Sequence, residues 1–154
     1  MSIYVAYTVL SLPTIESLKG YEFTMVPVHG SDAAYTEHLA DRWRQGHTFI
    51  NVEHDVVVPE GAIEALLACE RPWCYHFYAN HEGDFPFFGL VKFGAELIRD
   101  LPRVWDSMLA AEPSGHQPRW QICDTWLNMY PGRPEPHRHE PPAYNLRTHS
   151  HWRP

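Results

Sequence analysis

The alternation of apolar and polar positions predicts four strands. β-Branched and aromatic residues fill four runs, at 3–10, 21–28, 48–52 and 73–78. Pro13 closes the first run, and Pro27 places the end of the second at a sheet edge. The third run leads directly into Glu53-His54-Asp55, and residues 79–88 predict a loop.

Apolar residues spaced three and four positions apart predict helices between and after these strands. Tyr35, Leu39 and Trp43 form one stripe of a helix that ends at Gly46. Ile63, Leu66 and Leu67 form the buried side of a helix that Pro59 opens. Further helices are expected over 94–101, 104–111 and 119–130, and residues 131–154, rich in proline and histidine, are expected to form an extended, irregular tail.

This order of elements is typical of an α/β domain with an open, mostly parallel sheet flanked by helices. The length of 154 residues predicts one domain over 1–154, with the tail at 131–154 closing the site. Ligands of such sheets bind outside the carboxyl ends of the strands. Glu53 and Asp55 are therefore expected at the mouth of a site.

Glu53 and Asp55 lie two positions apart at a strand end, so the alternation of a strand points both side chains the same way. Two carboxylates that face one way can hold a hard divalent cation such as Mg²⁺ or Mn²⁺. The alternative is that acidic residues end this strand only because solvent begins there.

The charge is unevenly distributed. The chain has a net charge of −7, whereas residues 131–154 carry four arginines against two glutamates and the remaining body is correspondingly more acidic. An acidic body argues against bulk nucleic-acid binding, which needs a basic face. The basic tail can still meet a phosphate group or a metal-bound anion.

Cys69, Cys74 and Cys123 contain no C-x-x-C pair and lie in apolar runs, so reduced core thiols and a cytoplasmic location are expected. The first residues lack a basic leader, and no apolar stretch approaches the roughly 18 residues of a membrane span.

The tail contains two H-x-H pairs, His137 with His139 and His149 with His151. Such a pair on extended backbone presents both imidazoles on one face, where they can bind a metal ion. The alternative is a solvated terminus in which these histidines have no ligand. Lys92, between apolar neighbours, is expected to extend to the surface.

Asp124 lies at the boundary between an apolar helix face, with Trp120 and Leu127, and a polar strip. A half-shielded carboxylate has a raised proton affinity, which suits a general base. An ordinary boundary aspartate that bonds to its neighbours explains the same pattern.

Three stretches, 49–59, 88–93 and the segment from Trp120 through Asp124 to His151, resemble small glycosyltransferases of the GT-A type. Members of that family carry an acidic D-x-D strand end that holds Mn²⁺ or Mg²⁺ against a nucleotide-sugar diphosphate. Glu53-His54-Asp55 is similar to that motif. The resemblance implies a compact, truncated GT-A-like fold and transfer of a sugar, from a UDP-sugar by preference, to an unidentified acceptor.

The resemblance also implies roles for individual residues. Asp55 is expected to bind the metal ion together with His149 or His151. Thr8, Val9, His29 and Glu53 are expected to lie against the nucleotide. Asp124 is expected to deprotonate the acceptor hydroxyl.

Two other functions stay open at this point. The chain is shorter than typical members of that family, which favours a non-catalytic nucleotide- or metal-binding relic of the fold. The H-x-H pairs favour a small metallohydrolase with histidine and aspartate ligands.

Overall fold

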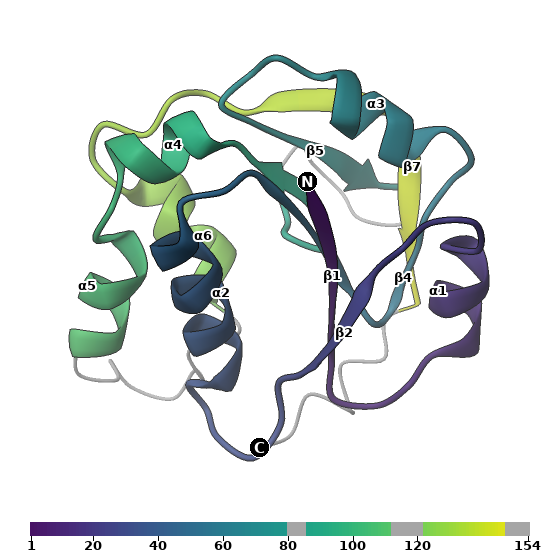
Figure 1. Ribbon diagram of the computed structural model, residues 1–154, viewed down its shortest axis with the longest axis horizontal. Helices are drawn as coiled ribbons and strands as arrows, with labels where there is room; N and C mark the ends of the chain where they lie inside the picture. The colour runs from purple at the N-terminus through teal and green to yellow at the C-terminus, as the bar shows by residue number, and fades with distance from the viewer. Residues whose placement is uncertain (80–85, 112–121, 147–154) are drawn as a thin grey trace.

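The computed structural model describes residues 1–79, 86–111 and 122–146, and Figure 1 shows one curled sheet with helices on both faces. The strands are β1 (Ser2–Tyr7), β2 (Thr24–Pro27), β3 (Phe49–Glu53), β4 (Val56–Val57), β5 (Trp73–Tyr78), β6 (Leu90–Phe93) and β7 (His137–Asn145). They form a 7-stranded sheet in the order β2-β1-β3-β6-β5-β7-β4.

Most strands of this sheet run in one direction. β1 pairs in parallel with β2 and β3, and β5 pairs in parallel with β7. β6 lies antiparallel between β3 and β5, and β4 lies antiparallel to β7. Consequently β1, β2, β3, β5 and β7 share one direction, and the expected open, mostly parallel α/β sheet is confirmed.

The helices are α1 (Leu12–Ser17), α2 (Ala34–Gln45), α3 (Ala62–Ala68), α4 (Ala95–Asp100), α5 (Val104–Ala110) and α6 (Cys123–Met129). One face of the sheet packs against α2, α4, α5 and α6, and the other packs against α1 and α3 (Figure 1). No helix within 1–79, 86–111 and 122–146 is long and apolar enough to cross a membrane.

Strand β3 shows how the sequence distributes residues between the two cores. Phe49 packs in the core under α2, whereas Ile50 and Val52 pack in the core under α3. Alternation then places Asn51 and Glu53 on the α2 face. This arrangement brings the strand's last carboxylate toward the helices that carry Tyr35 and Asp124.

Several local predictions are wrong. The first strand ends at Tyr7 instead of Leu10, and an unpredicted helix, α1, begins at Leu12, because Pro13 suits the first turn of a helix. Helix α3 begins at Ala62, after Gly61 in a left-handed conformation, and Leu67 is 44% exposed. The segment that follows the predicted loop contains a fully buried strand, β6, in which Lys92 is also buried.

The predicted irregular tail contains a regular strand. β7 pairs with β5 from His137 onward, and the register shifts between His76 and Tyr78 of β5. Pro141 and Pro142 lie opposite this shift and cannot donate backbone hydrogen bonds to the ladder. His137–Asn145 of the tail therefore form an inner strand of the sheet, between β5 and β4.

Candidate active site

The carboxyl ends of three parallel strands bring the predicted nucleotide residues to one edge. The register pairs Tyr7 with Pro27 and Ala6 with Glu53. Thr8 and Val9 follow β1, and His29 follows β2, so all three emerge at the edge where Glu53 ends β3. Thr8 is half-buried, while Val9 and His29 are exposed and available to a ligand.

Asp55 is a buried carboxylate whose two oxygens have no hydrogen-bond partner within the part of the chain that the structure describes. The residue is 1% exposed, and its backbone carbonyl accepts a hydrogen bond of 2.7 Å from the Leu146 N–H. A buried carboxylate without donors or a counter-charge is unfavourable. The two oxygens therefore fit a cation as their missing partner.

Glu53 lies beside Asp55 in a protected position. The Tyr35 hydroxyl donates a hydrogen bond of 2.9 Å to Glu53 Oε1. Burial, followed by the negative charge of Asp55, raises the pKa of Glu53 to about 8, although hydrogen bonds from Tyr35 and Tyr78 oppose the shift. Two carboxylates held this close favour either a shared proton or a bound cation.

Buried polar residues on β3 and α2 hold Glu53 in place. The Asn51 side-chain amide donates to the Tyr35 hydroxyl at 2.9 Å and to the Phe88 carbonyl at 3.0 Å. His38 Nε2 lies 3.3 Å from Asn51 Oδ1. In the sequence, the residue that indicates this series of hydrogen bonds is Asn51, a polar residue that interrupts an apolar strand two positions before Glu53.

Gly89 allows Tyr78 to approach the end of β3. The Gly89 carbonyl accepts a hydrogen bond of 2.9 Å from the Glu53 N–H. A Cβ atom on Gly89 would lie 1.6 Å from the Tyr78 hydroxyl oxygen, so any larger residue displaces the ring. Tyr78 interacts with Asn145 as well as with Glu53. Tyr35, Asn51, Tyr78 and Gly89 are contributors that sequence reasoning missed.

Asp124 approaches the same acidic cluster from α6. It is half-buried, and burial raises its pKa to about 6, although hydrogen bonds from Thr125 oppose the shift. The closest of these is the Thr125 N–H, at 2.7 Å from Asp124 Oδ1. The negative charge of Asp124 in turn raises the pKa of Glu53. The direction of this shift agrees with the prediction, whereas the role of Asp124 as a base stays a prediction. The expected contact with Trp120 lies outside the described residues.

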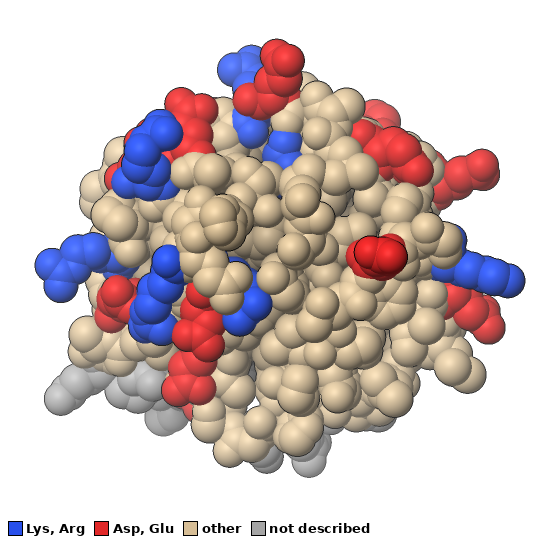
Figure 2. Space-filling view, in the orientation of Figure 1, with Lys and Arg blue, Asp and Glu red and all other residues tan. Residues whose placement is uncertain are grey.

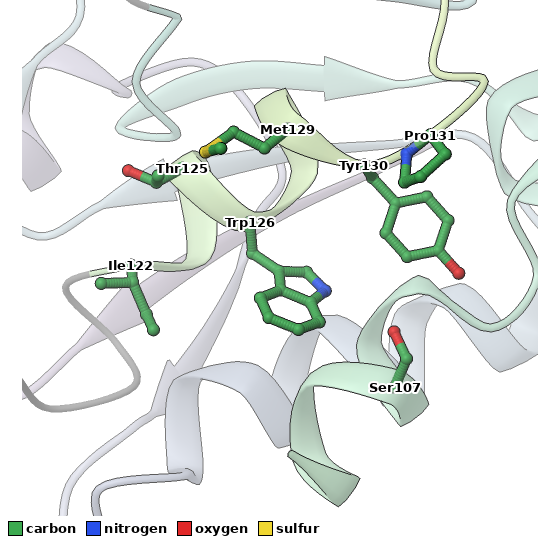
Figure 3. A pocket seen from close by; sticks show the side chains of 7 residues that line it. All are labelled: Ser107, Ile122, Thr125, Trp126, Met129, Tyr130 and Pro131. Atoms are coloured by element: carbon green, nitrogen blue, oxygen red, sulfur yellow. The ribbon is translucent and has the colours of Figure 1, made fainter. Parts of the chain in front are cut away.

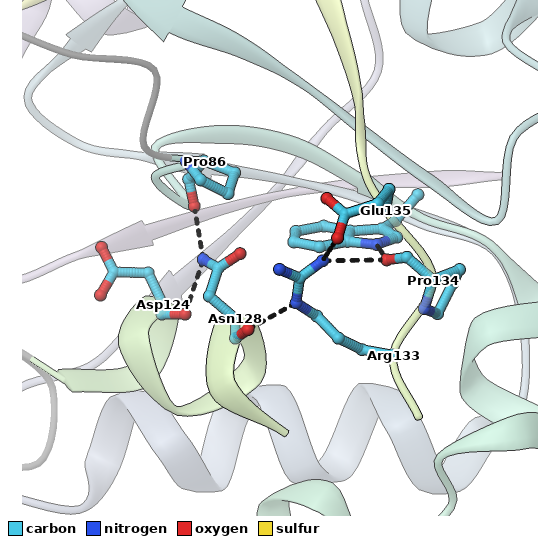
Figure 4. Close-up of polar contacts among 7 residues, drawn as sticks. Pro86, Asp124, Asn128, Arg133, Pro134 and Glu135 are labelled. Carbon is cyan, nitrogen blue, oxygen red and sulfur yellow. Dashed lines mark hydrogen bonds and ion pairs between the residues drawn. The ribbon is translucent and has the colours of Figure 1, made fainter. Parts of the chain in front are cut away.

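Asn128 joins Asp124 to a neighbouring cleft (Figure 4). Its amide donates to the Asp124 carbonyl at 2.8 Å and to the Pro86 carbonyl at 3.2 Å. Asn128, Tyr75, Arg133 and Glu135 line a cleft of about 530 Å³. Amide, phenol, guanidinium and carboxylate groups together suit a ligand that carries several hydroxyl groups.

The opposite side of α6 is apolar. Trp126 of α6 and Tyr130, which directly follows α6, project toward α5, which carries Ser107, as Figure 3 shows, and they line a groove of about 630 Å³. Trp126 Nε1 donates to the Val104 carbonyl at 3.0 Å, which fixes the indole against α5. The polar cleft and the apolar groove therefore lie on different sides of one short helix.

The two H-x-H pairs have different positions. His137 and His139 lie near the beginning of β7, and His139 precedes Asn145 by about 20 Å of extended strand. The first pair therefore does not join the acidic cluster. His149 and His151 lie outside the described residues, but they follow Leu146, which is bonded to Asp55.

On the side of the molecule that Figure 2 draws, lysine and arginine side chains form no extended basic surface. Lysine and arginine side chains alternate with aspartate and glutamate, and uncharged residues separate the groups. A mixed surface of this kind gives no broad electrostatic attraction to a polyanion.

No family model matches the chain, and no curated protein matches it significantly. Among solved structures, a glycosyltransferase involved in the glycosylation of the major capsid of PBCV-1 has a TM-score of 0.50 and 15% identity. The match covers 91% of this chain and 81% of that one. A197 from STIV has a TM-score of 0.46 and 14% identity, with 64% and 68% coverage. The match to the glycosyltransferase shows that the chain has a glycosyltransferase-like fold.

Proposed function

We propose that this protein is a metal-dependent glycosyltransferase that uses a nucleotide-sugar donor, by preference a UDP-sugar. One observation carries the proposal: Asp55 is a buried carboxylate with no hydrogen-bond donor among the described residues, at the carboxyl edge of a glycosyltransferase-like sheet. Glu53 lies beside it, and the charges of Asp55 and Asp124 both raise the pKa of Glu53, so the three carboxyl groups form one acidic cluster. The resemblance of Glu53-His54-Asp55 to the D-x-D motif is independent support.

The donor set fits Mn²⁺ or Mg²⁺, because carboxylate oxygens are the ligands that these hard ions prefer. Asp55 would hold the ion, with His149 or His151 as further proposed ligands. When bound, the ion supplies positive charge to a leaving diphosphate. Thr8, Val9, His29 and Glu53 would position the nucleotide at the ends of β1, β2 and β3.

Asp124 is the proposed base for the acceptor hydroxyl. Its raised pKa gives it a greater affinity for a proton than an exposed aspartate has, while it stays largely ionised at neutral pH. The polar cleft lined by Asn128 and Glu135 opens beside it and is the proposed position of the acceptor.

The test is thermal unfolding of the full chain with Mn²⁺ and with UDP, GDP or ADP, singly and together. We expect Mn²⁺ and UDP together to raise Tm more than either alone, because ligands that bind the native state stabilise it. Absence of a shift with every nucleotide would contradict the proposal.

Asp55→Asn is the informative variant, because it removes the charge and keeps the shape. It should fold and lose the joint shift. Asp106→Asn is the matched control, since Asp106 is an exposed carboxylate on α5 that pairs with Arg44. Hydrolysis of a UDP-sugar that Asp55→Asn stops would separate an enzyme from a non-catalytic relic.

A further inference from the structure

A second group of ligand atoms lies at the other end of the sheet. The Sγ atoms of Cys69 and Cys74 and one ring nitrogen of His139 all lie within 4.8 Å of one another. They come from the end of α3, from β5 and from β7, so the fold gathers residues that are far apart in the sequence. All three cysteines of the chain are free of disulfides.

The strand register places this cluster on the face under α3. Cys74 pairs with His137 on one side and with Lys92 on the other, and His76 pairs with His139. Cys74 belongs to the core under α3, and paired residues share a face. The cluster thus lies on the face opposite to Tyr35 and near the amino ends of β5 and β7, away from Asp55.

His139 has a ring nitrogen that lacks a protein partner. Its Nε2 is buried and has no hydrogen bond within the part of the chain that the structure describes. The ring stacks on His76, with centroids 5.4 Å apart. His76 itself is fixed, because its Nδ1 lies 2.7 Å from the Pro141 carbonyl and its Nε2 lies 3.3 Å from the Ala62 carbonyl. The His139 ring is therefore stacked on a fixed ring, and its Nε2 can bind a metal ion.

Lys92 adds a buried positive charge to the cluster. It is 5% exposed, and its Nζ donates to the Cys69 backbone carbonyl. Among the described residues, Lys92 takes part in no ion pair with a carboxylate. The contact with the Cys69 carbonyl places a cation next to Cys69, and a cation beside a sulfur favours the deprotonated form in which sulfur binds a metal ion.

We propose that Cys69, Cys74 and His139 form a binding site for a thiophilic metal ion, with Zn²⁺ as the ion that this donor set fits. Two sulfurs and one imidazole nitrogen supply three of the four positions of a tetrahedral zinc ion. Water or His137, whose ring centroid lies 4.6 Å from that of His139, completes the set. Each thiol releases its proton when the metal–sulfur bond forms, so binding of one ion releases two protons.

The site requires little rearrangement. Zinc–sulfur bonds of about 2.3 Å and zinc–nitrogen bonds of about 2.0 Å place tetrahedral ligand atoms roughly 3.5 Å apart. The donor atoms therefore need to converge by at most about 1.3 Å from their present separation. Because Cys69 is half-buried at the end of a short helix, its side chain can make that adjustment.

The test is titration of the reduced, metal-free full chain with Co²⁺, which reports sulfur ligands by an intense ligand-to-metal charge-transfer band. We expect this band to saturate at one Co²⁺ per chain, to be lost when Zn²⁺ displaces Co²⁺, and to persist with Mg²⁺. Cys69→Ser should weaken binding roughly 100-fold or more. Cys123→Ser is the matched control, since Cys123 is buried in the other core and should leave the titration unchanged.

His139→Gln provides a second variant that does not remove a thiol. It should weaken Co²⁺ binding and shift the absorption spectrum, because one nitrogen ligand is lost. Absence of the charge-transfer band in the wild-type protein would overturn the proposal, as would an unchanged titration in Cys69→Ser. Loss of the band in Asp55→Asn would also overturn it, because Co²⁺ binding at the thiols would then depend on the acidic edge.

Discussion

The two ends of this sheet carry opposite chemistry. At the carboxyl ends of the strands, Glu53, Asp55 and Asp124 gather oxygen ligands around a buried carboxylate without donors among the described residues. Near the amino ends of β5 and β7, Cys69, Cys74 and His139 gather sulfur and nitrogen ligands beside the buried ammonium of Lys92.

The two proposed sites therefore lie on different faces and at different ends of one sheet. Alternation places Glu53 on the α2 face and Cys74 on the α3 face. Hard oxygen ligands favour Mg²⁺ or Mn²⁺, while thiolates and imidazole favour Zn²⁺. The two regions should therefore respond to different ions and to different substitutions.

The largest effect is expected from Asp124→Asn. Loss of the proposed base should lower turnover of a UDP-sugar by roughly 10²- to 10⁴-fold, while Mn²⁺ and UDP binding persists. Since the base acts in its ionised form and its pKa is about 6, wild-type turnover should rise with pH through about 6 and then level off. Steady-state kinetics with Asp106→Asn as control measures both. Full activity in Asp124→Asn would exclude this role.

The next largest effect is expected when each variant is tested for binding of both metal ions. Asp55→Asn should weaken Mn²⁺ binding roughly 100-fold and leave Co²⁺ binding to the thiols intact, whereas Cys69→Ser should do the reverse. Parallel titrations of the two variants measure this. If either variant loses binding of both Mn²⁺ and Co²⁺, the two regions are not independent.

Gly89→Ala should affect the acidic end through packing. The added methyl group must displace the Tyr78 ring, which we expect to lower the free energy of unfolding by about 1–3 kcal/mol. Denaturant unfolding measures the loss, and Mn²⁺ binding should weaken while Co²⁺ binding persists. The double variant Gly89→Ala/Tyr78→Phe removes the Tyr78 hydroxyl oxygen, which is the atom nearest to the added methyl group, and should recover part of the lost stability. An unchanged stability of Gly89→Ala would contradict the described packing.

The smallest effect concerns His38, at the far end of the polar chain that supports Glu53. Burial lowers its pKa to about 4, below the value of 6.5 in an unfolded chain. The unfolded state therefore binds more protons between these values, and stability is lost as pH falls below 6.5. We expect a loss of about 1–2 kcal/mol between pH 7 and pH 5 from this residue. His38→Gln should flatten that part of the curve, and an identical slope would exclude the assignment.

The sequence predicted the sheet because β1, β3 and β5 are long apolar runs separated by clear helical stripes. β6 was missed because only four residues, Leu90–Phe93, form it, and Lys92 gave it the appearance of a surface segment. β7 was missed because proline and histidine have low strand propensity, and pairing with β5 overrides that local preference.

Glu53 and Asp55 could be predicted as a pair because they are close in the sequence. Strand alternation points them the same way, and ligands of such sheets bind at the carboxyl ends of the strands. Tyr35, Tyr78 and Gly89 could not, since their approach to Glu53 depends on packing between distant segments. The thiol cluster was hidden for the same reason: Cys69 and Cys74 resembled ordinary core residues, and only the position of β7 brings His139 to them.

The central claim is that Asp55 is the cation ligand of a nucleotide-sugar site. Electron paramagnetic resonance of Mn²⁺, titrated into the reduced full chain with and without UDP, tests it most directly because free and bound Mn²⁺ give distinct signals. We expect one bound Mn²⁺ per chain, tighter Mn²⁺ binding in the presence of UDP, and loss of both effects in Asp55→Asn. Equal Mn²⁺ binding by the wild-type protein and Asp55→Asn would contradict it.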